Sequence, residues 1–367
     1  MPLAESAGVE QHFSADFAAA QRRFRAGVAQ RHGRLDSLRL AAVGPSGEEL
    51  AIDIGWFGAP QPRRVFVHSS GIHGVEGYAG SAIQLQWLAD GLPALPPDAA
   101  IALVHVLNPY GFAWLRRANE NNVDLNRNFG AAGEDTGDAG LDYAPLDALL
   151  NPRSAPGLAP FYARSAWLVL RHGFPRMLQA VSAGQHVNSR GLFYAGTTPE
   201  PGYAAYRDYL QEKLARAQWI VAIDVHTGLG PYGEDTLLVD AAPDRRDVSQ
   251  TMHALFGNRV RLQDNAGFAY RVRGAQHDMY YSLFPRAAVH FAGQEFGTFN
   301  SVRVVAALRA ENYWHHQGAG PSHPAKQALF ATFCPADNAW RTRVLQRGRE
   351  VIAQACALTF GDLCAWT

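Results

Sequence analysis

The chain has 367 residues, of which 47% are hydrophobic, so it is long enough for one large or two medium domains with a sizeable core. Its formal net charge is zero and its pI is about 7.3, which gives no indication of a nucleic-acid or anionic-membrane partner. The three cysteines lack C-x-x-C spacing, which argues against a disulfide scaffold and a cysteine-built zinc site. We find no secretory signal and no apolar run long enough to span a membrane, and we expect a soluble cytoplasmic protein.

Helical and strand patterns alternate along the chain. The expected elements, in order, are a helix over 14–31, strands over 38–43 and 49–56, a strand from 65 and a helix after 76, a strand over 101–107, helices over 161–180 and 203–217, strands over 219–225 and from 287, and helices over 300–316 and 337–360. This alternation predicts an α/β fold with a mixed, mostly parallel central sheet flanked by helices. We expect a single domain over 1–367, with an N-terminal helix and hairpin (about 1–60) and a long irregular insert (about 130–200).

The most informative stretch begins with the apolar run at Val65 and continues into a Ser/Gly cluster that presents His73 and Glu76. The two side chains therefore lie where a buried strand ends and a helix begins, a frequent position for function in α/β proteins. One imidazole and one carboxylate are two of the three protein ligands that a catalytic zinc ion usually takes. The alternative is an ordinary surface loop, and this pair alone does not decide between them.

A second stretch, over 116–129, is rich in arginine and asparagine. Arg117 and Arg127 each have asparagines nearby and would suit a site that binds a carboxylate in a planar fork. Val123, Leu125 and Phe129 could anchor the stretch to a core. The alternative is a solvated loop with ordinary surface charges.

Two further strands end in polar side chains. The apolar run from Ile220 leads into His226, with Asp224 two residues earlier on the same face, so His226 is a candidate third metal ligand. A hydrogen-bonded core histidine is the alternative. Glu295 ends the other run, and a carboxylate in apolar surroundings needs a partner or a role, such as that of a general base.

Residues 228–233 match the pattern G-x-G-x-x-G directly after a strand. A dinucleotide-binding motif requires a helix that opens through the glycines. Here Pro231 lies inside the motif and the strand-like Leu237–Val239 follows, so we expect no nucleotide site.

In these stretches the sequence resembles the M14 family of zinc carboxypeptidases, in a divergent bacterial branch of the DUF2817 type. The resemblance spans about residues 65–300. Its motifs are, in order, GIHGVE at 71–76, NPYG at 108–111, VDLNRNF at 123–129, DVH at 224–226, and a late glutamate, Glu295. Each match is weak by itself, but their shared order makes the resemblance specific.

The resemblance implies a carboxypeptidase-like fold and one zinc ion held by His73, Glu76 and His226. It further implies roles for six other residues. Glu295 would be the general base, Arg117 would stabilise the oxyanion, and Asp124 would orient His73. Asn126 and Arg127 would bind the substrate's terminal carboxylate, and Tyr270 would cap the substrate. The long insert and Val75, at a position that is often arginine in digestive members, depart from the family pattern.

The expected activity is hydrolysis of an amide bond next to a free C-terminal carboxylate, in a small peptide or an N-acyl amino acid. An N-acyl amino-acid deacylase of the aspartoacylase or succinylglutamate desuccinylase type uses the same zinc constellation and stays open. A catalytically silent zinc or peptide-binding module is a third possibility, but such a binder would not need Glu295. The oligomeric state and the preferred side chain do not follow from the sequence.

Overall fold

The structure, a computed structural model, describes residues 8–129, 143–240, 246–262 and 274–361. Its strands are β1 (Arg34–Val43), β2 (Glu49–Gly58), β3 (Arg64–Ser70), β4 (Ala99–His105), β5 (Trp219–Thr227), β6 (Asp235–Val239), β7 (Val260–Leu262) and β8 (Ala288–Phe296). They form one eight-stranded sheet in the order β1-β2-β4-β3-β5-β8-β6-β7. The four central strands, β4, β3, β5 and β8, are parallel, and antiparallel pairs flank them on both sides. The predicted single α/β domain with a mixed, mostly parallel sheet is confirmed.

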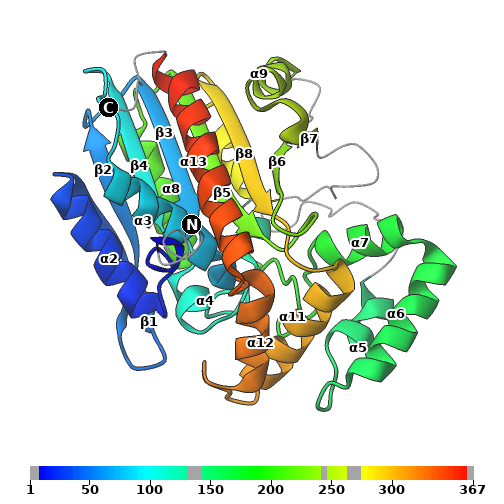
Figure 1. Ribbon diagram of the computed structural model, residues 1–367. Helices are drawn as coiled ribbons and strands as arrows, with labels where there is room; N and C mark the ends of the chain where they lie inside the picture. The colour runs from blue at the N-terminus through cyan, green and yellow to red at the C-terminus, as the bar shows by residue number, and fades with distance from the viewer. Residues whose placement is uncertain (1–7, 130–142, 241–245, 263–273, 362–367) are drawn as a thin grey trace.

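Helices cover both faces of this sheet (Figure 1). The helices are α2 (Phe17–Gln30), α3 (Gly77–Asp90), α4 (Pro109–Ala113), α5 (Ala144–Leu150), α6 (Leu158–His172), α7 (Phe174–Ser182), α8 (Pro201–Lys213), α9 (Arg246–Phe256), α10 (Gln276–Leu283), α11 (Ser301–His315), α12 (Pro324–Phe333) and α13 (Asn338–Phe360). On one face α2, α3 and α13 contribute Phe24, Ile83 and Val344 to a core that includes Phe66 of β3. On the other face α8 and α10 pack against the alternate side chains of the same strands. The central strands are therefore buried on both sides, which explains their continuous apolar sequence.

The insert differs from our expectation. We predicted an irregular segment with one helix over 161–180, but its described part forms the three helices α5, α6 and α7. Gly173 separates α6 from α7 with φ of +83°, a conformation that favours glycine, and Pro175 lies in the first turn of α7. The three helices pack with α11 and α12 around a separate core that contains Phe161, Leu168 and Phe333.

The sequence analysis did not predict five further elements: α4, β7, α9, α10 and α12. All are short, with three to eleven residues, and their sequences lack the long periodic pattern that identified α2 or α13. None of the described helices combines the length and apolar character needed to cross a membrane.

Candidate metal centre

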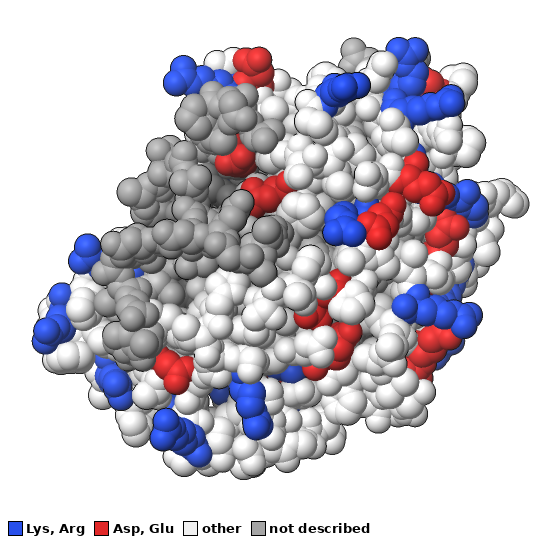
Figure 2. Space-filling model, turned by 180° about the vertical axis from the view of Figure 1, so that it is seen from behind, with Lys and Arg blue, Asp and Glu red and all other residues white. Residues whose placement is uncertain are grey.

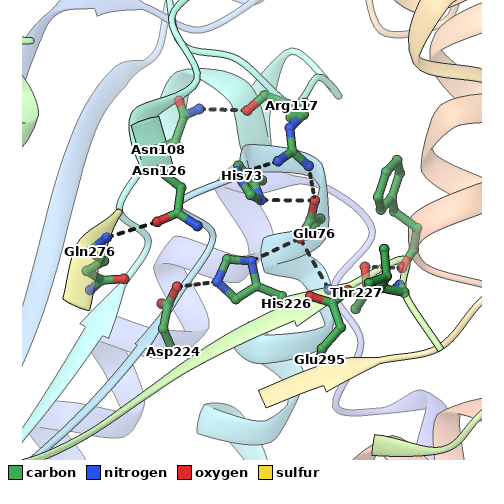
Figure 3. Close-up of polar contacts among 12 residues, drawn as sticks. His73, Glu76, Asn108, Arg117, Asn126, Asp224, His226, Thr227, Gln276 and Glu295 are labelled. Carbon is green, nitrogen blue, oxygen red and sulfur yellow. Dashed lines mark hydrogen bonds and ion pairs between the residues drawn. The ribbon is translucent and has the colours of Figure 1, made fainter. Parts of the chain in front are cut away.

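The predicted metal ligands meet at the carboxyl edge of the central parallel strands (Figure 3). His73 and Glu76 follow β3, and His226 lies near the end of β5. Glu295 lies on the adjacent strand β8, in register with His226. Because parallel strands end at the same edge of a sheet, segments that are far apart in the sequence deliver their side chains to one place.

The loop that carries His73 and Glu76 needs two glycines. Gly71 has φ of +68°, and a Cβ atom on Gly74 would lie 2.0 Å from the backbone carbon of Gly111. The backbone amides of Gly74 and Val75 donate to the carbonyls of Arg117 and Arg116. The ligand loop is thus fixed directly against the loop that carries Arg117. Val75 itself is buried in the core of the insert.

One ligand atom from each of His73, Glu76 and His226 lies within 4.8 Å of the other two, and all three residues are buried. Nδ1 of His73 lies 3.1 Å from Oε1 of Glu76, and Nδ1 of His226 lies 3.3 Å from Oε2. Nδ1 of His73 nevertheless finds no hydrogen-bond partner. A buried nitrogen without a partner, beside a carboxylate and a second imidazole, fits the donor set of a divalent cation such as zinc.

Each histidine is held from behind by an aspartate. Oδ1 of Asp124 lies 3.0 Å from Nε2 of His73, and Oδ2 of Asp224 lies 2.7 Å from Nε2 of His226. Ser69 donates a hydrogen bond of 2.6 Å to Oδ1 of Asp224. A carboxylate on the second ring nitrogen usually orients a metal-binding histidine and selects its tautomer, so the arrangement fits a metal site. Our candidate residues did not include Asp224, although the strand alternation had placed it on the face of His226.

Arg117 lies between the ligand carboxylate and Asp124. Its guanidinium donates to Oε1 of Glu76 at 2.9 Å and to Oδ2 of Asp124 at 3.0 Å. Burial by itself would raise the pKa of both carboxyls. His73 and Arg117 nevertheless hold the pKa of each carboxyl well below its ordinary value, and His226 adds to this effect at Glu76. Both groups are therefore ionised.

Carboxylates outnumber the arginines in this cluster. The four carboxylates are Glu76, Asp124, Asp224 and Glu295, and the two arginines are Arg117 and Arg127. Burial would lower the pKa of His226, yet Asp224 and Glu76 raise it well above the ordinary value of histidine. A cluster that draws a proton onto a buried imidazole lacks positive charge, which a divalent cation would supply.

Glu295 lies beside this cluster without belonging to the ligand set. Its Oε1 accepts a hydrogen bond of 2.9 Å from the backbone amide of Leu229. Burial and the negative charge of Glu76 raise the pKa of Glu295 to about 7, against the opposing effect of His226. A carboxyl with such a pKa can both accept and release a proton near neutral pH.

Asn126 and Arg127 lie on the short 3-10 turn Leu125–Arg127. Oδ1 of Asn126 accepts from the backbone amide of Gln276, which leaves the side-chain NH2 as its available donor group. Arg127 is only 1% exposed and donates to Asp124 at 2.8 Å. Arg127 thus has a structural partner in addition to any substrate. Tyr270, the expected capping residue, lies outside the described residues.

Two residues near the site had no signal in the sequence. Gln276 connects both sides of the centre, because its side chain donates to Ser69 and its backbone amide to Asn126. Phe193, from the insert, lies with its ring 5.3 Å from the guanidinium carbon of Arg117 and has φ of +60°. A bulky residue in this conformation is unusual and is found most often at functional sites.

The glycine-rich segment 228–233 is a turn between β5 and β6, as we expected from its sequence. No helix opens through it, so the geometry of a dinucleotide site is missing.

Several solved structures are similar to this chain. Bovine thrombin-activatable fibrinolysis inhibitor, in complex with tick carboxypeptidase inhibitor, is 12% identical with a TM-score of 0.46, over 91% of this chain and 98% of that one. A murein-tripeptide amidase from Escherichia coli O157 is 19% identical with a TM-score of 0.36, over 77% and 92% of the two chains. A succinylglutamate desuccinylase from Silicibacter sp. TM1040 is 13% identical with a TM-score of 0.39, over 78% and 67%.

No curated protein matches the sequence. A family model does: residues 13–347 match the family described as "Protein of unknown function (DUF2817)". This match covers nearly the whole chain, including every candidate residue of the metal centre. The protein therefore belongs to the DUF2817 family, in agreement with the branch that the sequence motifs resemble.

Proposed function

We propose that the protein is a zinc-dependent hydrolase that cleaves an amide bond next to a free C-terminal carboxylate, as a metallocarboxypeptidase does. The observation that carries the proposal is the convergence of three buried ligand candidates, His73, Glu76 and His226, with Glu295 in register on the next strand. Three ligands leave the open coordination position that distinguishes a catalytic zinc site from a structural one.

A bound zinc ion supplies Lewis-acid chemistry and lowers the pKa of water to about 7. Glu295 takes the proton of the attacking water. Because Oε1 of Glu295 accepts from Leu229, Oε2 is the oxygen that holds this proton before it passes to the leaving nitrogen. Arg117, held in position by Glu76 and Asp124, donates to the oxygen on which negative charge develops. Loss of one such donor typically costs roughly 100–1000-fold in rate.

On the substrate side we assign the terminal carboxylate to Asn126 and Arg127, and substrate capping to Tyr270. The support for Asn126 is its partly exposed position with the amide NH2 available. Arg127 lies buried behind Asn126, where we assign to its guanidinium both positive charge and a planar fork for the carboxylate, together with Arg117. The ring centre of Phe193 lies within 5.5 Å of the guanidinium carbons of both arginines, at the distance of a cation–π contact.

Two alternatives remain from the sequence. A deacylase of N-acyl amino acids would use the same ligands, base and carboxylate site, and differs only in the group on the acyl side of the scissile bond. A silent binding module is disfavoured by Glu295, because its raised pKa suits proton transfer and has no use in binding alone. The cytoplasmic location stays a prediction.

The test is hydrolysis of dipeptides, N-acyl amino acids and their C-terminal amides by the purified protein, before and after removal of metal by a chelator. We expect activity on one of the two acid classes, loss with the chelator and recovery with zinc. Preference for dipeptides supports the carboxypeptidase and preference for N-acyl amino acids supports the deacylase. Absence of hydrolysis in a protein that binds zinc would instead indicate the silent module.

Glu295→Gln separates chemistry from binding, because it keeps the shape of the side chain and removes the base. We expect unchanged zinc content and hydrolysis slower by at least about 100-fold. Glu234→Gln, which alters an exposed carboxylate outside the metal centre, is the matched control and should keep full activity. Equal rates for Glu295→Gln and the parent would show that Glu295 is structural.

Arg127→Lys tests the carboxylate assignment. Lysine keeps the charge but loses the planar fork, so kcat/KM should fall for substrates with a free carboxylate and much less for their amides. The opposing explanation is that Arg127 only fixes Asp124. In that case both substrates should suffer equally, and the melting temperature should fall with them.

A further inference from the structure

Charged residues are unevenly distributed along the insert: its six acidic residues lie at 134–147 or at 200, and its five arginines all lie between these positions. Between Asp147 and Glu200 the sequence contains no acidic residue and five arginines, namely Arg153, Arg164, Arg171, Arg176 and Arg190. Helices α6 and α7 fall in this segment and lie at one side of the molecule, beside α11 (Figure 1). Seen from behind, the lower left of the molecule shows blue side chains separated by white surface, with one acidic patch among them (Figure 2).

The same helices expose an unusual amount of apolar surface. Among the described residues, nine large hydrophobic side chains are exposed, and six of them belong to the insert: Leu158, Tyr162, Trp167, Leu170, Phe174 and Val187. Leu170 is 87% exposed and Trp167 is 54% exposed. The opposite face of α6 already packs in the core through Phe161 and Leu168. The outward apolar face is therefore additional to what folding of the insert requires.

Arginines border this outward face. Arg164, Arg171 and Arg176 are exposed, and none of them forms an ion pair with a carboxylate in the described part of the chain. The guanidinium carbon of Arg171 lies 5.4 Å from the ring centre of Trp167. We call the surface formed by these three arginines with Trp167, Leu170 and Phe174 the insert face.

We propose that the insert face binds the surface of an anionic phospholipid membrane, with α6 and α7 lying in the plane of the interface. Tryptophan, leucine and phenylalanine suit the boundary between headgroups and acyl chains, and arginines suit the negatively charged headgroups. This peripheral contact needs no membrane-spanning helix. It arises from the local positive charge of residues 148–199, which the net charge of the whole chain averages out.

A second copy of the chain is the competing occupant. In a two-fold symmetric contact the same face meets itself, which would bring the arginines of both copies together without described carboxylates to neutralise them. Like charges at such short range oppose association, whereas anionic headgroups attract the same arginines. The positive charge of the insert face therefore favours an anionic membrane over a second copy of the chain as its binding partner.

The experiment is co-sedimentation of the full chain with vesicles of phosphatidylcholine, alone or mixed with phosphatidylglycerol, at low and at physiological ionic strength. We expect binding to the mixed vesicles that weakens with salt, and little binding to phosphatidylcholine alone. Two double variants test the two components of the face: Trp167→Ser with Leu170→Ser, and Arg164→Gln with Arg171→Gln. Each should weaken partition into the mixed vesicles by about tenfold.

The matched control is Val43→Ser with Arg22→Gln, which removes an exposed hydrophobic side chain and an exposed arginine outside the insert. It should bind as the parent does, and all variants should keep the parent's melting temperature because the altered side chains are exposed. Absence of binding at low salt, or equal binding by all variants, would overturn the proposal. A second result would also overturn it: a dimer seen by sedimentation velocity without vesicles, and converted to monomer by Trp167→Ser with Leu170→Ser. The occupant of the insert face would then be a second copy of the chain.

Discussion

Two neighbouring arginines, Arg116 and Arg117, enter two different buried charge clusters. Arg117 belongs to the metal centre, where carboxylates exceed arginines. Arg116 donates to Asn122 and Asn312 and lies 3.7 Å from Glu311, which also binds Lys326. We call Arg116, Glu311, His315 and Lys326 the Lys326 cluster.

Burial lowers the pKa of the histidine in both clusters, but the neighbouring charges act on it in opposite directions. In the metal centre the pKa of His226 is raised. In the Lys326 cluster burial, together with Arg116 and Lys326, lowers the pKa of His315 to about 2, and burial with Arg116 lowers the pKa of Lys326 to about 8 despite Glu311. The first cluster lacks positive charge. The second cluster has more positive charge than its single carboxylate, Glu311, can balance. Burial of polar groups alone therefore does not distinguish the two clusters, whereas the sign of the charge imbalance does, and only the first sign suits a bound cation.

The largest expected effect comes from replacing one histidine in each cluster by alanine and comparing the two variants. His226→Ala removes a proposed ligand, so zinc content should fall from about one per chain towards zero and hydrolysis with it. His315→Ala should keep both, because its cluster repels a cation. Zinc content measured on the two dialysed proteins decides the matter, and equal loss in both would refute the distinction between the clusters.

Glu311→Gln tests what the second cluster does instead. It leaves Arg116 and Lys326 buried without their carboxylate, and loss of one partner from a buried ion pair costs about 3–5 kcal/mol. We expect a large loss in denaturant unfolding with zinc content per folded chain unchanged. A variant as stable as the parent would show that the ion pairs of this cluster contribute nothing.

Asp224→Asn sharpens the description of the metal centre. The amide keeps the size of the side chain but no longer attracts the proton on Nε2 of His226, 2.7 Å from Oδ2. Support of this kind is typically worth about 10–100-fold in metal affinity. Competition with a chromogenic chelator measures the change, which should leave the melting temperature of the metal-free protein nearly unaltered. An unchanged affinity would mean that Asp224 does not support the ligand.

The smallest expected effect is a pH dependence. The pKa of Lys326 is lowered to about 8 in the folded protein, below the 10.5 of the ordinary side chain, so above pH 8 the unfolded chain binds more protons than the folded one. The free energy of unfolding should therefore rise with pH between about 8 and 9.5, by roughly 1.5 kcal/mol. Lys326→Met should lack this rise. Parallel curves for the two proteins would show that Lys326 keeps its ordinary pKa.

The sequence alone determined those parts of the site that depend on local chain geometry. His73 and Glu76 are three residues apart on one loop, and Asp224 and His226 share a strand face because side chains alternate with a period of two. The buried runs of β3, β5 and β8 were readable for a similar reason, since central parallel strands are apolar on both faces. The order of these motifs sufficed to suggest the family and the ligand set.

Short elements and interruptions of a periodic pattern could not be predicted from the sequence. The helix predicted over 161–180 is two helices, because the backbone at Gly173 has positive φ, and α12 has no long pattern to reveal it. The turn chemistry of one glycine outweighs the apolar spacing on either side of it.

Only the tertiary structure decided which segments share the centre. The register of β5 with β8 sets Glu295 beside His226, 69 positions apart in the sequence, and the loop contacts bring Asp124 onto His73. The two adjacent arginines enter separate clusters for the same reason, since each pairs with a carboxylate distant in the sequence: Arg117 with Glu76 and Arg116 with Glu311. Local sequence sets the spacing of side chains along a strand or turn, but the long-range pairing of the strands and the packing of α11 and α12 decide which charges meet.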